Sequence, residues 1–283
     1  MGVRIITDSA CDMSQAEAQE KNIILLPLTI TFGEEEYQDG VTINNEQFYK
    51  RLQKKDIFPK TSQVSPFVYE KEIEKARGEG DEVLIITISS KVSGCYQSAV
   101  IAREHHPEGV YICDSMHVCG SEYIIVELAA RLRDQGKSAE EIFNILEKEK
   151  HRARLATAFD TLEYLKLGGR LSNASAFIGT LFNFKPILKV EEGLISSVGK
   201  ARGSKKANLK LKELIKSFGE VDEDMPVSLA LADKDDTNMN DFCDIASDII
   251  PPMNKILRTE VGATVGAHAG PGAFAFSFFI KEK

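Results

Sequence analysis

Three short apolar runs rich in β-branched residues constrain the fold more than any other feature, because a helical pattern follows each of them. They cover Val3–Thr7, Val83–Ile88 and Val110–Cys113. Runs of this length bounded by polar residues are typical of buried strands, and strand–helix alternation produces a parallel sheet with helices on both faces. We expect Ile23–Ile30 to add a further strand. The sequence therefore predicts an α/β domain, arranged as α/β/α, over residues 1–155.

Local signals mark where several helices begin. Ser14 and Ser138 are each followed three residues later by a glutamate, which is the pattern of a capping box. At Ser65-Pro66 the proline would occupy the first helical position, where its missing N–H costs no hydrogen bond. We therefore expect helices to start at these three points, the one after Ser138 reaching about Lys150.

The pattern changes after residue 155. Pro186–Glu191 and Leu194–Val198 flank Glu192-Gly193, which favours a hairpin. A basic helix is expected over Ser204–Phe218. Further strands are expected near Val227–Ala232, Ile256–Val261 and Ala273–Ile280. Because hairpin-linked strands with interposed helices form mixed or antiparallel sheets, residues 156–283 are predicted to be an α+β domain.

The charge balance excludes one broad class of partner. The chain has 35 Lys and Arg residues against 43 Asp and Glu residues, a net charge of −8. Such a chain repels a phosphate backbone, so nucleic-acid binding is not expected. No apolar run approaches the roughly 18 residues of a membrane helix, and no secretory signal opens the sequence. The five cysteines are odd in number and irregularly spaced, so we expect reduced thiols and a cytoplasmic location.

Hydroxyl groups gather in two segments. Ser89–Ser98 follows a predicted strand and opens a helix, so Ser93-Gly94 would place hydroxyl and amide donors at a positive helix end. This arrangement suits an anion. The alternative, preferred on this segment alone, is that Ser93 only caps the helix. Thr61–Pro66 holds three hydroxyls and one amide, a composition shared with ordinary N-cap loops.

Two glycine-rich segments carry an arginine and a histidine. Gly168-Gly169 end a predicted helix and precede Arg170, whose planar guanidinium suits a carboxylate or phosphate. His268 lies in the glycine-dense loop Gly266–Gly272, where backbone can approach a ligand closely. A plain helix C-cap and a structural histidine are the simpler interpretations. The basic stretch that includes Arg202 is either a solvated helix face or a site for an acidic partner or phosphate.

Known catalytic and cofactor motifs are missing from the sequence. It contains no phosphate loop, no GxGxxG after a strand, no GxSxG elbow and no HExxH. Cys113, His117 and Cys119 lie close together, but their spacing fits no standard zinc site. We therefore predict no cofactor and no metal.

Taken together, seven segments resemble the DegV family of bacterial fatty-acid-binding proteins. They are Ile6–Asp12, Tyr37–Gly40, Thr61–Pro66, Ser89–Ser98, Thr161–Ser172, Lys185–Leu188 and the His268 loop with its Gly-Pro-Gly. They follow the order of the family and span nearly the whole chain. The sequence departs from the family's common residues at Val64 (for Pro), Cys95 (for Thr) and Ala269 (for Thr), and these departures bear on acyl-chain preference rather than on membership.

The resemblance implies a two-domain protein that encloses one long-chain fatty acid in a tunnel and holds its carboxylate in a polar pocket. The contacts to the carboxylate would be Thr61, Ser62, Ser93, Gly94 and His268, and those for phosphoryl transfer or partner contact Arg170 and Arg202. Members of the family act as the lipid-presenting subunit of fatty-acid kinase. The implied partner is therefore a separate ATP-binding kinase subunit, and the chain itself would not be an enzyme. The same role allows a transient contact with a membrane surface.

Two other functions remain open at this stage. In one, the protein is a hydrolase with Ser93 as nucleophile and His268 as base, although no elbow motif supports it. In the other, it carries or senses a different small amphiphile and has no kinase partner. The residue types of the two hydroxyl-rich segments are compatible with each.

Overall fold

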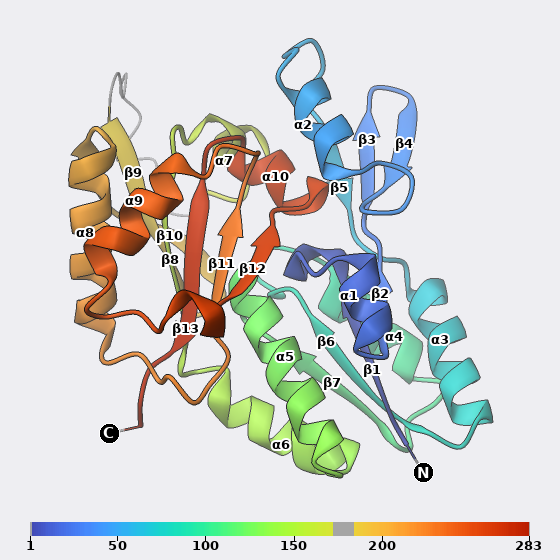
Figure 1. Ribbon diagram of the computed structural model, residues 1–283. Coiled ribbons are helices and arrows are strands. Elements are labelled where there is room, and N and C mark those ends of the chain that lie inside the picture. The colour runs from blue at the N-terminus through green and yellow to red at the C-terminus, as the bar shows by residue number, and fades with distance from the viewer. Residues whose placement is uncertain (1, 172–183, 283) are drawn as a thin grey trace.

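The computed structural model describes residues 2–171 and 184–282, and their strands form two large sheets and one small one (Figure 1). The first large sheet is entirely parallel, in the order β2-β1-β6-β7. Its strands are β1 (Val3–Asp8), β2 (Ile23–Leu26), β6 (Glu82–Thr87) and β7 (Val110–Asp114). The predicted parallel sheet is confirmed, and each of the three β-branched runs is one of its strands.

Helices cover both faces of this sheet. They are α1 (Gln15–Glu20), α3 (Pro66–Gly78), α4 (Cys95–Arg103), α5 (Gly120–Asp134) and α6 (Ala139–Glu149). Ile6 and Ile85 pack with α3 and α4, whereas Ile5 and Leu84 pack with α5 and α6. Neighbouring side chains along a strand point to opposite faces, which explains why these runs are apolar throughout.

The helix starts predicted from local signals are confirmed. Ser14 and Ser138 each accept a hydrogen bond from the amide three residues later, and the glutamate there bonds back to the cap. Pro66 is the first residue of α3. The basic segment forms α8, with the predicted bounds Ser204–Phe218.

The single strand expected over Ile23–Ile30 is wrong. Pro27 lacks an N–H for the ladder, and the chain leaves the parallel sheet there to form β3 (Thr29–Phe32). β3 lies between β4 (Glu35–Gln38) and β5 (Lys60–Ser62) in a small antiparallel sheet. Helix α2 (Asn45–Leu52) connects β4 to β5 in the sequence. This sheet places Thr61 and Ser62 on a strand instead of in a loop.

The second large sheet is mixed and has the order β10-β9-β8-β13-β11-β12. Its strands are β8 (Ala153–Ala158), β9 (Phe184–Glu191), β10 (Leu194–Arg202), β11 (Ser228–Leu231), β12 (Leu257–Glu260) and β13 (Phe274–Phe279). Only β11 and β12 pair in parallel. α8 and α9 (Thr237–Ala246) pack on one face, which confirms the α+β prediction. β8 crosses the predicted boundary after residue 155, and that boundary stays a prediction.

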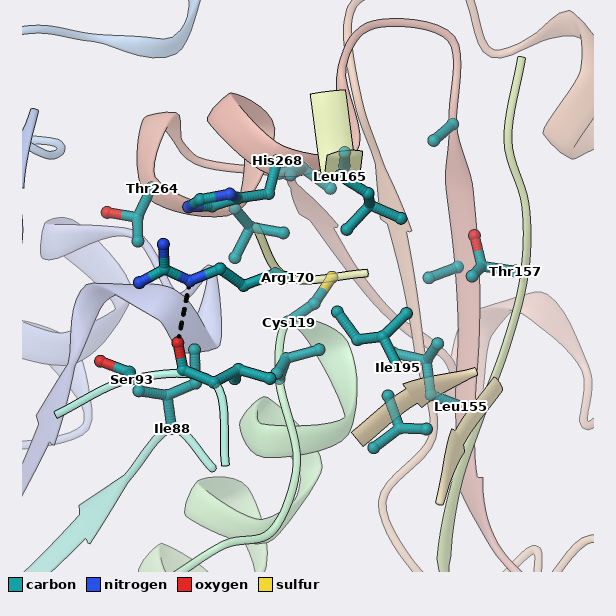
Figure 2. A pocket seen from close by; sticks show the side chains of 18 of the residues that line it. Ile88, Ser93, Cys119, Leu155, Thr157, Leu165, Arg170, Ile195, Thr264 and His268 are labelled. Carbon is teal, nitrogen blue, oxygen red and sulfur yellow. Dashed lines mark hydrogen bonds between the residues drawn. The ribbon is translucent and has the colours of Figure 1, made fainter. Parts of the chain in front are cut away.

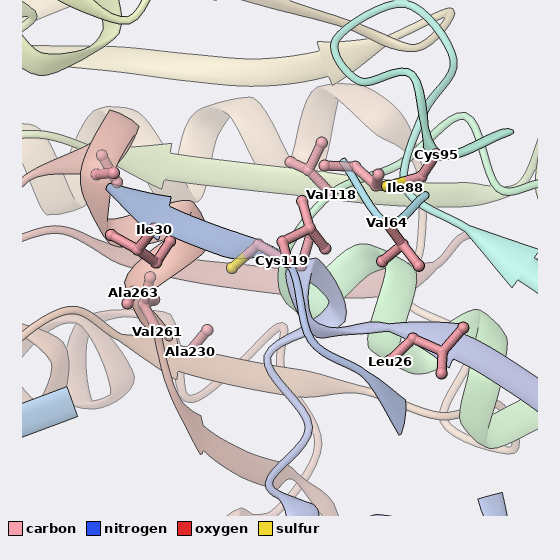
Figure 3. Packing of buried hydrophobic residues seen from close by; sticks show 14 of the residues in the cluster. Leu26, Ile30, Val64, Ile88, Cys95, Val118, Cys119, Ala230, Val261 and Ala263 are labelled. Atoms are coloured by element: carbon pink, nitrogen blue, oxygen red, sulfur yellow. The ribbon is translucent and has the colours of Figure 1, made fainter. Parts of the chain in front are cut away.

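The part of the protein around the parallel sheet (the first half) and the part around the mixed sheet (the second half) share one apolar core. Ile6 and Ile85 of the parallel sheet belong to the same buried cluster as Ala230 and Ala275 of the mixed sheet. Figure 3 shows the junction, where Cys119, just before α5, lies near residues of β3 and of the chain that follows β12. The halves are therefore continuous in packing although their sheets are separate.

Helix α5 fills the space between the two sheets, and all but three of its 15 residues are buried. Its first residue, Gly120, makes a close contact with the mixed sheet. The Ser228 hydroxyl donates to the Gly120 carbonyl at 3.0 Å, and a Cβ on Gly120 would lie 2.6 Å from that hydroxyl oxygen. Glycine is thus required at this position by the packing of helix on strand.

The expectation of a glycine-dense loop around His268 is also wrong. Residues 263–269 form helix α10 (Ala263–Ala269), and His268 lies in its last turn. Gly266 is in the helix because it packs against the ring of Tyr49, where a Cβ would come within 2.7 Å of the phenol oxygen. Of the glycines in the segment 266–272, Gly270 and Gly272, at φ 73° and 78°, use the left-handed freedom of glycine, and Gly266 is helical.

Candidate ligand-binding site

A cavity of about 450 Å³ lies between the two halves of the protein. This volume is within the range of roughly 300–1,000 Å³ found for small-molecule sites. Both halves contribute to its wall, for example Ile88 and Val118 from the first and Leu155 and Phe274 from the second. In Figure 2 the polar side chains Ser93, Arg170, Thr264 and His268 lie on one side, with Ile88 beside Ser93, and the apolar side chains Leu155 and Ile195 lie on the other. The cavity is therefore amphipathic.

The polar end gathers residues that are far apart in the sequence. Thr61, Ser62, Ser93, Gly94, Arg170 and His268 all line the cavity. Thr61 comes from β5 and His268 from α10, and Thr61 Oγ1 lies 2.9 Å from His268 Nε2. Six of the seven residues named from the sequence thus lie in one cavity, and their contact with a carboxylate stays a prediction.

Arg202 is the seventh predicted site residue, and it lies outside the cavity. It is the last residue of β10, its side chain is exposed, and it does not line the cavity. Ser172, the last residue of the Thr161–Ser172 segment, lies outside the described residues.

His268 is uncharged at neutral pH. Burial lowers the pKa of its imidazole to about 4, and the nearby Arg170 guanidinium acts in the same direction. The ring Nδ1 is buried with no hydrogen-bond partner among the described residues, and it faces Gly168, where a Cβ would lie 2.1 Å away. The tautomer with Nε2–H bonded to Thr61 Oγ1 avoids a buried unpaired donor. It leaves the Thr61 hydroxyl hydrogen free to donate into the cavity.

We expect Gly168→Ala to destabilise the protein by about 1–3 kcal/mol, because the added methyl group overpacks the His268 ring. Gly168 has φ −76°, so the backbone itself accepts alanine. Urea unfolding measures the change. The control is Gly78→Ala, at the end of α3 with nothing within 4 Å of the new Cβ, which should be neutral or slightly stabilising. Equal stability of wild type and Gly168→Ala would contradict the packing described here.

We expect the contribution of His268 to the free energy of unfolding to fall as the pH is lowered from about 6.5 to about 4. In this window the unfolded chain protonates the imidazole and the folded protein does not, so this contribution rises with pH by up to about 1.4 kcal/mol per pH unit. Asp8 and Asp12, whose pKa values burial raises to about 7 and about 8, contribute the opposite slope. Both aspartates are present in wild type and in His268→Gln, so their contributions cancel in the difference between the two proteins. Urea unfolding should therefore show that the free energy of unfolding of wild type, minus that of the variant, rises with pH across this range, and parallel curves would show that His268 is not a buried neutral base.

Arg170 is tethered at the polar end by two backbone carbonyls. Its Nε donates to Val92 at 3.1 Å and its Nη1 to Gly168 at 2.8 Å. These bonds use two of the five N–H groups of the guanidinium. The side chain is half-buried and lines the cavity, so its remaining donors and its charge are available to an anion there.

Ser93 precedes Gly94, which is the N-cap residue of α4. The Ser93 Oγ accepts from the Cys95 amide, the first amide of the helix, and donates to the Cys95 Sγ, both at 3.3 Å. It also lines the cavity next to Gly94. Both bonds are long, and an anionic acceptor would offer the hydroxyl a stronger bond than a thiol does.

Gln63 lies in Thr61–Pro66, one of the segments that resemble the DegV family, but the sequence alone indicates no role for it. Its amide donates to Ser98 Oγ at 2.7 Å, and its Oε1 lies so close to Gly94 that a Cβ there would be 1.8 Å away. Gln63 thus joins the strand that carries Thr61 to the helix start that carries Ser93. The side chain positions both hydroxyls at one end of the cavity.

A hydrolytic Ser93–His268 pair is not formed. Among the described residues, His268 Nε2 bonds to Thr61 and the Ser93 hydroxyl bonds to Cys95, and no hydrogen bond joins serine to histidine. A nucleophile activated by a base requires such a bond. The geometry therefore gives the hydrolase alternative no support.

Most of the rest of the cavity wall is apolar, although Lys189, whose Nζ pairs with Glu191 at 2.8 Å, also lines it. Leu155, Leu188, Ile195 and Phe274 are among its residues. Thr157 also lines it, but its hydroxyl donates to the Phe274 carbonyl at 2.6 Å and is thereby satisfied within the sheet. This part of the cavity suits a hydrocarbon chain.

One group of side chains with metal-ligating atoms lies outside the cavity. Glu70 and Glu74 on α3 and His106 after α4 bring these atoms within 4.8 Å of one another. His105 bonds to Glu70 at 2.6 Å, and His106 lies 3.6 Å from Glu74, so both carboxyls of this partly exposed group already have a histidine beside them. The five cysteines are all buried and free of disulfides.

Within residues 2–171 and 184–282, no helix has the length and apolar character needed to cross a membrane.

The fold and the cavity together define a two-domain α/β protein with an apolar ligand pocket that has a cluster of hydroxyls, a neutral histidine and an arginine at one end. The chain belongs to the DegV family: the model of that family, described as "Uncharacterised protein, DegV family", matches residues 2–281.

Relatives match the chain over its whole length. A DegV domain-containing protein of Clostridium acetobutylicum is 37% identical over 282 residues, which cover 99% of each chain. Among solved structures, a DegV family protein from Thermus thermophilus described by its fatty acid binding is 30% identical, with a TM-score of 0.90 over 99% of this chain and 100% of that one. A stearic-acid-binding protein from Eubacterium ventriosum is 25% identical, with a TM-score of 0.84 over 99% of each chain. The similarity to solved DegV structures confirms the fold class.

Proposed function

We propose that this protein binds one long-chain fatty acid in the cavity between its halves and presents the carboxylate to a separate ATP-binding kinase subunit. The observation that carries the proposal is the amphipathic cavity, which joins an apolar wall to the polar cluster of Thr61, Ser93, Arg170 and His268. The fatty-acid binding for which the Thermus and Eubacterium proteins are described supports the same ligand class.

The energetics of such a ligand fit this arrangement. Burying a sixteen-carbon chain contributes roughly 0.8 kcal/mol per methylene, or about 11 kcal/mol before ordering costs are subtracted. The head group therefore needs orientation more than strong attraction. Hydroxyl donors and a neutral imidazole orient a carboxylate, and the charge of Arg170 adds favourable electrostatics.

The sequence agrees with presentation to a separate kinase subunit, the role that the resemblance to the DegV family implies. The chain contains neither a phosphate loop nor a GxGxxG motif after a strand. Phosphorylation of the bound acid would therefore depend on a partner that supplies ATP, with this chain holding the acyl group in place. In this role the protein is a binding subunit and not itself an enzyme.

Native mass spectrometry of the protein purified from a bacterial host tests the ligand class. We expect one bound C14–C18 acid per chain, identified after denaturation and lipid extraction. A phosphorylated sugar or another amphiphile in its place, or protein that stays empty when it is mixed with fatty acid, would contradict the proposal. Mixing loaded protein with a kinase subunit and ATP then tests presentation, with acyl phosphate as the expected product.

A further inference from the structure

Two buried aspartates of the first half hold the start of helix α10, which belongs to the second half. Asp39 follows β4 and is 3% exposed, and Asp12 follows the short 3-10 helix Ser9–Cys11 after β1 and is 4% exposed. Neither aspartate lines the cavity. Their contacts therefore call for a separate explanation.

Asp39 accepts hydrogen bonds from the first two amides of α10. Its Oδ1 receives the Ala263 N–H at 2.9 Å and its Oδ2 the Thr264 N–H at 3.0 Å, and the Ser9 hydroxyl also donates to Oδ2 at 3.0 Å. Asp12 Oδ1 accepts the preceding amide, that of Gly262, at 2.9 Å. A carboxylate on the first amides of a helix is favourable because these groups have no partner within the helix.

Burial raises the pKa of Asp39, and the bonds that it receives from α10 and from Ser9 act in the opposite direction because they stabilise the ionised form. Within residues 2–171 and 184–282, every hydrogen bond of this carboxyl is donated to it, as an ionised carboxylate requires. Removing one of its oxygens would leave a buried amide of α10 without an acceptor.

Helix α10 is only seven residues long, so its position depends on such anchors and not on its own stability. Its start is fixed by Asp39, and Ala263 packs in the shared core near Ile30 (Figure 3). Its end carries His268, and the helix lines the cavity with Thr264, Val265, His268 and Ala269. A shift at the first turn would thus move the imidazole that bonds to Thr61.

We propose that Asp39 is a positioning residue for the cavity: by holding the first turn of α10 it sets the place of His268 and, through His268, the direction of the Thr61 hydroxyl. The identity of the affected ligand rests on the proposed function. The placement of His268 does not rest on it.

The first test is made without ligand. NMR of ¹⁵N-histidine-labelled protein reports the tautomer of His268 and its bond to Thr61. We expect Asp39→Asn, which is nearly isosteric but turns an amide NH₂ toward the N–H groups of α10, to shift the His268 ring signals. The control is Asn208→Ala, which removes buried hydrogen bonds between α8 and Asn238 away from the cavity and should leave those signals in place.

The second test measures hexadecanoic acid binding by titration calorimetry, at a temperature where both variants are folded. We expect Asp39→Asn to weaken affinity at least tenfold and Asn208→Ala to change it less than twofold. Unchanged His268 signals in Asp39→Asn, or equal losses of affinity in the two variants, would overturn the positioning role. If Asp39→Asn does not fold, Ser9→Ala, which removes one donor to Asp39, decides by the same readouts with smaller shifts expected. Wild type that fails to bind the acid would instead contradict the proposed function, and the NMR result would still decide the role of Asp39.

Discussion

Replacing both Thr61 and Ser93 by alanine is expected to weaken long-chain fatty-acid binding by about two to four orders of magnitude. Each hydroxyl would donate to a charged acceptor, and such bonds contribute roughly 1.5–3 kcal/mol each, or about 3–6 kcal/mol together. The empty protein should lose less stability. Thr61 gives up one bond to His268, and Ser93 gives up two long bonds to Cys95. Titration calorimetry with hexadecanoic acid measures the affinity, and urea unfolding measures the stability.

Ser90→Ala provides the matched control for this prediction. Ser90 lies in the same loop as Ser93, but its side chain is exposed and does not line the cavity. Its replacement should leave the affinity unchanged. If the Thr61→Ala/Ser93→Ala protein binds as tightly as wild type, the carboxylate lies somewhere else in the cavity.

Replacing Arg170 by alanine is expected to reduce acyl-phosphate formation by about 10³-fold while lipid loading falls much less. Phosphorylation turns a carboxylate with one charge into an acyl phosphate with nearly two, so positive charge is needed most in the transition state. Arg170 is the arginine that lines the polar end, and two carbonyls hold it there. Lipid loading and acyl phosphate are measured side by side with a kinase subunit present.

Arg202→Ala separates partner contact from chemistry. Because Arg202 is exposed and away from the cavity lining, we expect its loss to raise the concentration of kinase subunit needed, with loading unchanged. Equal loss of loading and phosphorylation in Arg170→Ala would make that residue a ligand of the lipid alone. If neither variant changes lipid loading or acyl-phosphate formation, neither arginine has a role in the reaction, and both are only surface charges.

Regular elements with strong apolar patterns could be predicted from the sequence, and weakly patterned ones could not. The β-branched runs became β1, β6 and β7, and α8 has the bounds that its pattern indicates. β4 is largely exposed and β5 has only three residues, so neither leaves a periodic signal. Both form because β3 leaves the parallel sheet at Pro27 and offers them an edge to pair with.

The candidate site could be predicted as a set of segments but not as a geometry. Thr61 and His268 are 207 positions apart, and nothing local indicates that their side chains meet. The glycines around His268 suggested a loop because glycine is rare inside helices, whereas Gly266 serves close packing on α2. The role of Asp39 required the structure, since its partners are backbone amides of a helix more than 220 residues later.

The contact between Gly120 and Ser228 bears on how a ligand enters. Many two-domain proteins open by a hinge, with each half moving as a rigid body about a thin connection. Here α5 is wedged against both sheets, and its first turn touches β11 without room for a methyl group. Swinging the halves apart would strip apolar surface from α5 and cost far more than a loop movement. Entry should therefore depend on small displacements of segments at the rim of the cavity, while the two sheets keep a fixed relative orientation throughout loading and release.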